Sequence, residues 1–257
     1  MSFVTPIVSV APLRADSNHR SEMVSQFLFG EVAELIETTK DFSRIRILFD
    51  DYIGWCQNIQ LVVVTDKMVR EGNNRLTADL FNSVICNETP MQIPFGTPLN
   101  FFEMGEARMG NFEFVYQGKS WIPEEAHFNE TTIRWVANHF MNTAYLWGGR
   151  TIMGIDCSGL TQQVFRFLGI NLPRDAHQQA VLGDSVGFLQ EALCGDLAFF
   201  DSLEGKINHV GILLNAETIM HSSGKVRIDY IDNMGIISKD SGERTHQLRI
   251  IKRYYVQ

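Results

Sequence analysis

The sequence predicts a multidomain protein in which two small β-barrels precede an α+β domain. Short apolar runs broken by turn residues fill the first half of the 257-residue chain, as is typical of short strands. After Pro123 the apolar residues recur at helical spacing, and short apolar runs return nearer the C-terminus. Helices followed by a run of strands are typical of an α+β domain.

The composition is that of an ordinary globular protein with an acidic balance. Hydrophobic residues make up 45% of the chain, and the formal net charge is −8 without clusters of Lys or Arg. Nucleic acids and anionic membrane surfaces are therefore poor partners, and a cationic or zwitterionic small substrate is easier to accept. The four cysteines are widely scattered, so we expect reduced thiols rather than a disulfide framework.

The N-terminal segment lacks the pattern of a secretory signal. Residues 1–14 contain no charged region followed by a long apolar region, and no apolar run of the chain is long enough to span a bilayer. We expect a cytoplasmic protein, or a periplasmic or secreted one if a signal peptide has been removed.

The β-rich half contains an internal repeat. The segments Gly30–Glu37 and Gly96–Glu103 have apolar residues and Glu in the same register, and the separation from Gly30 to Trp55 equals that from Gly96 to Trp121. Two related β units of about five strands would explain this, each a minimal barrel. Chance similarity between two β-rich segments is the alternative.

The second half predicts three helical stretches and then an antiparallel meander. Thr131 or Thr132 can cap a helix whose apolar face contains Ile133, Val136, Ala137 and Phe140. A shorter helix is predicted over residues 175–182, where Asp175 suits a helix N-terminus. The predicted strands are 196–200, 209–214, 218–221, 225–228 and 248–251.

Cys157 lies at the start of the predicted helix between these two, which ends before Gly169. Unpaired N–H groups and the helix dipole favour a thiolate at this position, so we expect a lowered pKa and a nucleophile near neutral pH. The alternative is a buried cysteine that packs as a small apolar side chain. The polar neighbours Asp156 and Ser158, and Gly159 with its close backbone approach, favour a cleft.

A thiol nucleophile needs a base and a third group that orients the base. His209 begins one predicted strand and His221 ends the next, so an antiparallel pair brings the two imidazoles together. We expect the remaining histidines to be surface or structural residues: His19, His127, His139, His177 and His246. A zinc site is the alternative, and it is weaker because no Cys-x-x-Cys or His-x-x-x-His pair occurs in the sequence.

Five motifs in order resemble the NlpC family of papain-like cysteine peptidases over residues 127–228. They are Tyr145-x-Trp-Gly-Gly, Asp156-Cys-Ser-Gly-Leu, Leu172-Pro-Arg, Gly195-Asp-Leu-x-Phe-Phe and His209-Val-Gly-Ile. The first half, with His19-Arg-Ser-Glu-Met, resembles the bacterial SH3-like modules of one branch. That branch is the γ-D-glutamyl-L-diamino acid endopeptidases, or dipeptidyl-peptidases VI, which trim murein peptides with a free N-terminal L-Ala.

The resemblance implies two SH3-like β-barrels followed by an α+β papain-like catalytic domain of the NlpC type. The domain boundaries would be 1–58, 59–124 and 125–257. The catalytic set that it implies is Cys157 as nucleophile, His209 as general base and acid, His221 as the orienting residue, and Tyr145 as a hydroxyl donor to the oxyanion beside the Cys157 N–H.

Substrate-binding residues also follow from the resemblance. An acid matching Glu22 and the Asp175 position recognise the free ammonium of the substrate in this branch. The set that we expect to bind substrate is Glu22, Tyr52, Asp156, Ser158, Arg174 and Asp175. The family usually has serine where this chain has Ala176, which puts one expected substrate hydrogen bond in doubt.

Three functions follow as hypotheses. The first is hydrolysis of the γ-D-Glu to diamino acid bond of murein peptides through a thioester, without cofactor or metal, in peptidoglycan peptide turnover or recycling. The second is an acyltransferase or lipid amidase of the same fold, and the third is a non-catalytic wall-binding protein. For the first, the partner is a murein-derived peptide such as L-Ala-γ-D-Glu-diamino acid, with no nucleic acid and no membrane.

Overall fold

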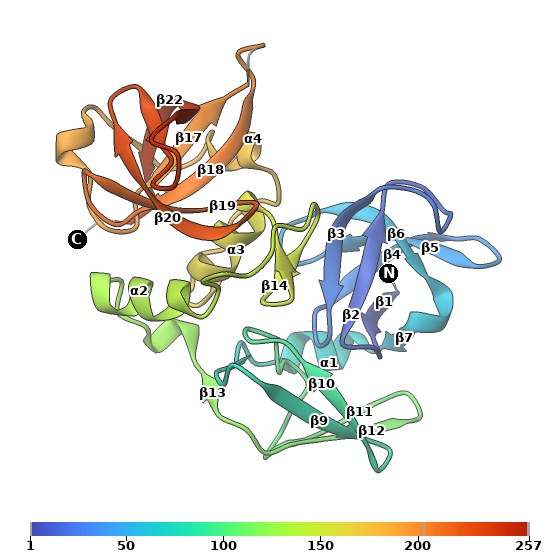
Figure 1. Cartoon of the computed structure of the whole chain (residues 1–257). Coiled ribbons are helices and arrows are strands. Elements are labelled where there is room, and N and C mark those ends of the chain that lie inside the picture. Colours follow the sequence, from blue (N-terminus) through green and yellow to red (C-terminus); the bar gives the residue numbers. More distant parts are fainter. Residues whose placement is uncertain (1, 203, 256–257) are drawn as a thin grey trace. The chain divides into compact units, whose positions relative to one another are not determined.

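The computed structural model describes residues 2–202 and 204–255 and divides the chain into two units, Met1–Glu124 and Glu125–Gln257. In Figure 1 the first unit runs from blue to green and the second from green to red. Along the described residues, no helix is long and apolar enough to cross a membrane.

An antiparallel sheet begins the first unit, with its strands in the order β3-β2-β6-β5-β4-β1-β7. The strands are β1 (Phe3–Pro6), β2 (Val10–Arg14), β3 (Met23–Leu28), β4 (Ala33–Thr38), β5 (Phe42–Ile47), β6 (Ile53–Gln57) and β7 (Leu61–Val64). Leu13, Phe27 and Ile45 are fully buried on one face of the sheet, because side chains alternate between the two faces of a strand. Strand β7 lies at the edge of this sheet and pairs with β1.

The first unit also contains a second sheet, in the order β10-β9-β12-β11, and a separate two-stranded sheet formed by β13 and β8. Their elements are β8 (Leu76–Thr77), β9 (Asn82–Cys86), β10 (Thr89–Ile93), β11 (Glu106–Met109), β12 (Phe112–Tyr116) and β13 (Ser120–Trp121), joined to β7 by α1 (Asp66–Glu71). Phe29 and Val32 of the first segment lie in one apolar cluster with Val84, Phe102 and Phe114 of the second. The two segments therefore share a core.

The sequence repeat has a partial structural counterpart. Gly30 and Gly96 both have φ of +77°, and each follows an antiparallel hairpin, β2–β3 or β9–β10. Strands β4, β5 and β6 lead from Gly30 to Trp55, and β11, β12 and β13 lead from Gly96 to Trp121. The pairing differs at the end, because β6 pairs with β5 and β2 whereas β13 pairs with β8.

The second unit begins with helix α2 (Glu130–Asn138), which follows the 3₁₀ turn Pro123–Glu125. Its predicted apolar face is confirmed, since Ile133, Val136 and Ala137 are fully buried. The predicted cap is wrong: Asn129, rather than Thr131 or Thr132, precedes the helix, and its side chain accepts a hydrogen bond from the Thr132 N–H.

Two further helices and a β-ribbon follow. The ribbon pairs β14 (Arg150–Thr151) with β15 (Gly154–Ile155), and it leads directly into α3 (Cys157–Arg166). Helix α4 (Ala176–Gln179) is shorter than the predicted stretch of residues 175–182, and Asp175 is its N-cap residue. In Figure 1, α3 lies beside β19, and it also packs on β18.

The predicted meander closes on itself. Its strand order is β16-β22-β17-β18-β19-β20-β21, and β21 also pairs with β22, so β17 to β22 form a closed ring. The elements are β16 (Asp184–Val186), the 3₁₀ turn Leu189–Glu191, β17 (Leu197–Asp201), β18 (Ile207–Leu213), β19 (Thr218–Ser223), β20 (Lys225–Asp232), β21 (Gly235–Ile237) and β22 (Arg244–Arg253). Closure leaves no strand edge within the ring unpaired.

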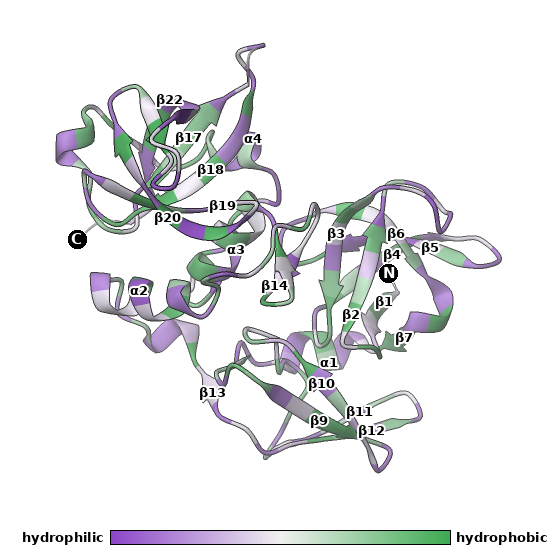
Figure 2. Ribbon diagram, in the orientation of Figure 1, coloured by the Kyte–Doolittle hydropathy of each residue, from purple (hydrophilic) through white to green (hydrophobic). Residues whose placement is uncertain are grey.

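An apolar core fills this ring, with Phe200, Leu213, Ile219, Ile231 and Ile236 among its buried residues. Figure 2 shows that β17 and β18 consist mostly of hydrophobic residues, in green. Residues directly opposite each other on paired strands share a face. The ring therefore has an inner face, on which polar residues stand out among the apolar ones.

Candidate active site

Helix α3 presents Cys157 at its first residue, as the sequence predicts. The Asp156 side chain caps the helix by accepting from the Gly159 N–H at 2.7 Å, and Gly169, with φ of +74°, follows its C-terminal end. A Cβ added to Gly159 would lie 2.3 Å from the Gly149 carbonyl oxygen, so only glycine lets α3 approach the segment after Tyr145 this closely.

The Cys157 sulfur lies against strand β18. Cys157 is 6% exposed, and its sulfur accepts hydrogen bonds from the backbone N–H groups of Val210 and Ser158. Val210 is the residue after His209. The start of α3 and the strand that bears His209 therefore meet at the sulfur.

The expected lowering of the Cys157 pKa is wrong. Burial raises the pKa of the thiol to about 12, and the nearby Asp156 carboxylate adds to the rise, although the two N–H groups and Arg174 oppose it. The desolvation penalty of the thiolate is larger than the stabilisation that the thiolate gains at the start of the helix. The resting group is a neutral thiol, and it needs a base when it reacts.

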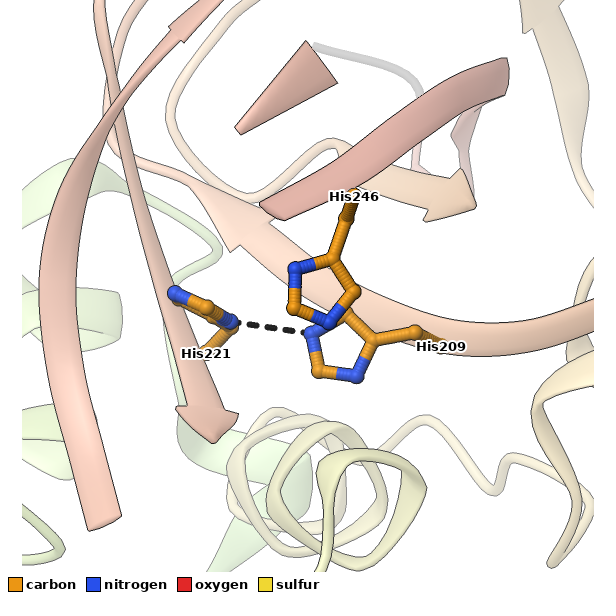
Figure 3. Close-up of side chains that lie close together, drawn as sticks. All are labelled: His209, His221 and His246. Carbon is orange, nitrogen blue, oxygen red and sulfur yellow. Dashed lines mark hydrogen bonds between the residues drawn. The ribbon is translucent and has the colours of Figure 1, made fainter. Parts of the chain in front are cut away.

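The β18–β19 hairpin brings the two imidazoles together, as the sequence predicts. His209 Nε2 and His221 Nδ1 are 2.9 Å apart, and His221 Nε2 lies 3.0 Å from Asp229 Oδ2. Figure 3 shows the first of these contacts as a dashed line. His209 is opposite Phe200, and His221 is opposite Gly211, so both histidines lie on the inner face of the ring.

His246 joins this pair, although the sequence predicted a surface or structural residue. Its ring stacks on that of His209 with centroids 4.1 Å apart and planes 24° apart (Figure 3). His246 is opposite Ile236 on β21, a pairing that exists only because the ring closes. No local pattern around His246 could have indicated this position.

Burial lowers the pKa of His209 well below 6.5, and the neighbouring His246 and His221 lower it further. The pKa of His246 falls to about 4, chiefly through burial. His209 is therefore neutral near pH 7 and can accept a proton, which is the property that a general base needs.

The same three histidines could hold a metal ion. One ring nitrogen from each of His209, His221 and His246 lies within 4.8 Å of the others. The hydrogen bond between His209 Nε2 and His221 Nδ1 occupies one nitrogen of each of these two rings. A metal ion that used those two nitrogens would have to replace that bond.

Asp156, Ser158 and Arg174 form a buried network around the start of α3. Arg174 donates to Asp156 Oδ1 at 3.0 Å, to Asp156 Oδ2 at 2.5 Å and to Ser158 Oγ at 2.8 Å. The Gly148 N–H also donates to Asp156, at 2.9 Å. The structure thus brings these three residues together beside Cys157, and their contact with substrate stays a prediction.

Removing the cation of this network is expected to destabilise the protein strongly. Arg174→Ala leaves the Asp156 carboxylate buried without its guanidinium, which costs about 3–5 kcal/mol. Arg249→Ala is the matched control, because Arg249 is 64% exposed and lies 3.8 Å from Asp201, and its loss should cost about 0–1 kcal/mol. Equilibrium urea denaturation of the full chain measures both, and equal effects would contradict the structural role of the network.

Tyr145 lies near the thiol. Its N–H donates to the Gly224 carbonyl at 3.0 Å, and burial together with Cys157 and Asp156 raises the pKa of its hydroxyl to about 12. The hydroxyl therefore keeps its proton at neutral pH and can act as a donor.

The other predicted binding residues lie at two places. Asp175 precedes α4, where its N–H donates to Gln178 Oε1 at 3.2 Å, and Ala176 is buried at the first position of that helix. In the first unit, Glu22 is exposed just before β3, and Tyr52 packs against the core of its sheet. The roles of these residues toward a substrate stay predictions.

Comparison with protein families gives two matches. Residues 142–244 match the NlpC/P60 family, and residues 13–61 match the bacterial dipeptidyl-peptidase SH3 domain. The first match includes α3 and the strands β18 and β19, which carry His209 and His221, and it ends before His246. The second lies within the sheet of the first unit.

Individual proteins are also similar to part or most of this chain. A γ-D-glutamyl-L-lysine dipeptidyl-peptidase of Bacillus subtilis is 42% identical over 85 residues, which cover 32% of this chain and 28% of that protein. The matched stretch thus spans less than two thirds of that relative. A dipeptidyl-peptidase 6 of Lysinibacillus sphaericus is 24% identical over 259 residues, which cover 88% of this chain and 90% of the relative.

A solved structure shares the fold over nearly the whole chain. It is an NlpC/P60 family protein from Bacillus cereus ATCC 10987, with a TM-score of 0.80 at 18% identity, covering 98% of this chain and 99% of the other. At this identity the likeness concerns the fold alone.

Proposed function

We propose that this chain, which contains an NlpC/P60 domain preceded by a bacterial dipeptidyl-peptidase SH3 domain, is a cysteine peptidase of murein peptides. Its reaction is hydrolysis of the γ-D-Glu to diamino acid bond in peptides with a free N-terminal L-Ala. The observation that carries the proposal is the meeting of the Cys157 sulfur with β18, beside a neutral His209 that is hydrogen-bonded to His221.

The reaction follows from these groups. His209 takes the thiol proton as the Cys157 sulfur bonds to the γ-carbonyl carbon of D-Glu. The Tyr145 hydroxyl and the Cys157 N–H stabilise the oxyanion that forms. The carbon–nitrogen bond then breaks, and His209 gives its proton to the leaving amine of the diamino acid. Water, deprotonated by His209, attacks the resulting thioester and releases L-Ala-γ-D-Glu with the free thiol.

The substrate class is supported by the printed names of the relatives and by the acidic balance of the chain. Peptides with a free L-Ala carry an ammonium group, which an acidic site attracts. We place this reaction in the turnover or recycling of peptidoglycan peptides. The relatives' activity concerns those proteins, and here it supports the choice of substrate to test.

The division into domains is part of the proposal. We propose SH3-like modules at residues 1–58 and 59–124, ahead of a catalytic domain at 125–257. The second module is supported by the matching φ of Gly30 and Gly96 and by the corresponding hairpins that precede them. The shared core means that neither module is expected to fold without the other.

We propose further that Glu22 and Asp175 select for the free ammonium of the substrate. A charge-assisted hydrogen bond contributes about 1.5–3 kcal/mol, or roughly a tenfold to hundredfold preference for a free amine. The wild type should hydrolyse L-Ala-γ-D-Glu-diaminopimelate faster than its N-acetylated form by this factor. Glu22→Gln should reduce the preference, as measured by kcat/KM on the two peptides.

Glu37→Gln is the matched control, because Glu37 is an exposed acid of the same unit that pairs with Arg44. It should leave the preference unchanged. Equal wild-type rates on the two peptides would remove the role of the ammonium, and an unaltered preference in Glu22→Gln would remove Glu22 alone. The catalytic assignment would stand in both cases.

The reaction products distinguish the two other candidate functions from the proposed one. Acyl transfer or lipid hydrolysis would give products other than free L-Ala-γ-D-Glu and diamino acid, and a wall-binding protein would give none. The connected pair of His209 and His221 on the inner face of the ring argues against a purely binding role, since burying two imidazoles has a cost that an apolar core avoids.

A further inference from the structure

We infer that Asp229 is a positioning residue that sets the tautomer of His209 through His221. The inference rests on the proposed function, in which His209 is the base for Cys157. It adds a residue that none of the sequence motifs contains.

Both carboxylate oxygens of Asp229 have polar partners. Its side chain is 3% exposed. Oδ1 accepts from Arg227 Nη2 at 2.8 Å and from the Lys239 N–H at 2.9 Å. Oδ2 lies 3.0 Å from His221 Nε2 and 2.8 Å from Arg227 Nε. The β19–β20 register sets His221 opposite Arg227 and Ile219 opposite Asp229, so Asp229 is the diagonal neighbour of His221 on the inner face.

The carboxylate stays ionised. Burial by itself would raise the pKa of Asp229, but the hydrogen bonds from His221, Arg227 and the Lys239 N–H outweigh it and hold the pKa well below its usual range. An ionised carboxylate can only accept hydrogen bonds. His221 therefore carries its proton on Nε2.

The tautomer of His221 then determines which nitrogen of His209 carries the proton. A neutral His221 with its proton on Nε2 has a bare Nδ1, which accepts from His209 Nε2 across 2.9 Å. A neutral His209 with its proton on Nε2 keeps a lone pair on Nδ1. Figure 3 shows that this nitrogen points away from His221. The lone pair is thus free to take the thiol proton, as the proposed reaction requires.

Asp229→Asn tests this sequence of tautomers. Arg227 Nη2 and the Lys239 N–H both donate to Oδ1, whereas Arg227 Nε lies 2.8 Å from Oδ2 without a hydrogen bond. We therefore expect the amide oxygen to take the Oδ1 position and the amide NH₂ to face His221. His221 Nε2 must then accept, its proton moves to Nδ1, and His209 receives that hydrogen bond on Nε2. The His209 proton is forced onto Nδ1, where the lone pair is needed. We expect kcat/KM to fall about 10²–10⁴-fold.

The matched control is Asp240→Asn. Asp240 is 77% exposed and pairs with the same guanidinium, at 2.9 Å from Arg227 Nη2. Its loss should change kcat/KM by no more than about threefold. In a His221→Ala background, Asp229→Asn should have no further effect on kcat/KM, because the intermediate ring is gone. A merely structural carboxylate would have the same effect in both backgrounds.

Nitrogen-15 NMR of the histidine rings reads the tautomers without any substrate. In the wild type, His209 and His221 should both be protonated on Nε2, and in Asp229→Asn both on Nδ1. Wild-type rings protonated on Nδ1 would overturn the inference even if the variant did not fold. Unchanged tautomers in a folded Asp229→Asn would overturn it as well. If the murein tripeptide were not a substrate, the proposed function would fail, but these spectra would still test the role of Asp229.

Discussion

Cys157→Ala is expected to lose at least about 10⁴-fold in kcat/KM on the murein tripeptide. The sulfur is the atom that bonds to the substrate, and no other group at the start of α3 can replace it. The fold should survive, because removing one buried sulfur leaves a small cavity that costs at most about 2 kcal/mol. Steady-state kinetics and urea denaturation of the same preparation measure the two effects.

Alkylation provides the control for this prediction. Burial raises the pKa of both Cys157 and Cys56 to about 12, so the two thiols have similar intrinsic acidity. Only Cys157 lies against the strand that carries His209. Iodoacetamide should therefore label Cys157 much faster than Cys56, and Cys56→Ala should keep full activity. Hydrolysis retained by a folded Cys157→Ala would remove the cysteine-peptidase assignment.

His209→Ala is expected to lower kcat/KM by about 10²–10⁴-fold, and His221→Ala should lower it less. The first variant removes the group that carries the proton, whereas the second leaves the base in place and only releases its orientation. The loss should appear in kcat, since neither substitution removes a group that holds the substrate in the ground state.

The pH profile tests the same residue. His209 must be neutral to act, and its pKa is lowered well below 6.5 by burial, His246 and His221. Activity should therefore persist below pH 6.5 and fall only as the pH drops through the lowered pKa. On the alkaline side, Tyr145 and Cys157 keep their protons until about pH 12. The pH profile of activity should therefore be a broad bell-shaped curve.

His177→Ala is the control, because His177 is exposed on α4, and its profile should match that of the wild type. An acid limb at or above pH 6.5 would contradict the environment described for His209. If zinc restored activity to chelated wild type, the three histidines would have to be reinterpreted as a metal site.

Local patterns explain the part of the site that the sequence predicted. Cys157 at a helix start, the stop at Gly169 and the buried face of α2 all follow from spacing within a few residues. The cap of α2 was misplaced because Asn129, Thr131 and Thr132 are all good N-cap residues, and only the backbone geometry selects one of them.

The rest depended on contacts between distant strands. His246 enters the site only because β21 pairs with β22 and closes the ring, and Asp229 because β20 aligns with β19 in one register. The sign of the Cys157 shift has the same origin. A helix start favours the thiolate, but the packing of β18 over the sulfur removes water, and that effect is larger.

In the proposed reaction, Cys157 carries the acyl group of D-Glu as a thioester. Intact-protein and peptide mass spectrometry of the enzyme, mixed with L-Ala-γ-D-Glu-diaminopimelate and quenched in acid, tests it directly. We expect the enzyme to gain the mass of an L-Ala-γ-D-Glu acyl group on the peptide containing Cys157, and the Asp229→Asn variant to gain it more slowly. Turnover of the tripeptide without this mass, or the same mass on another residue, would contradict it.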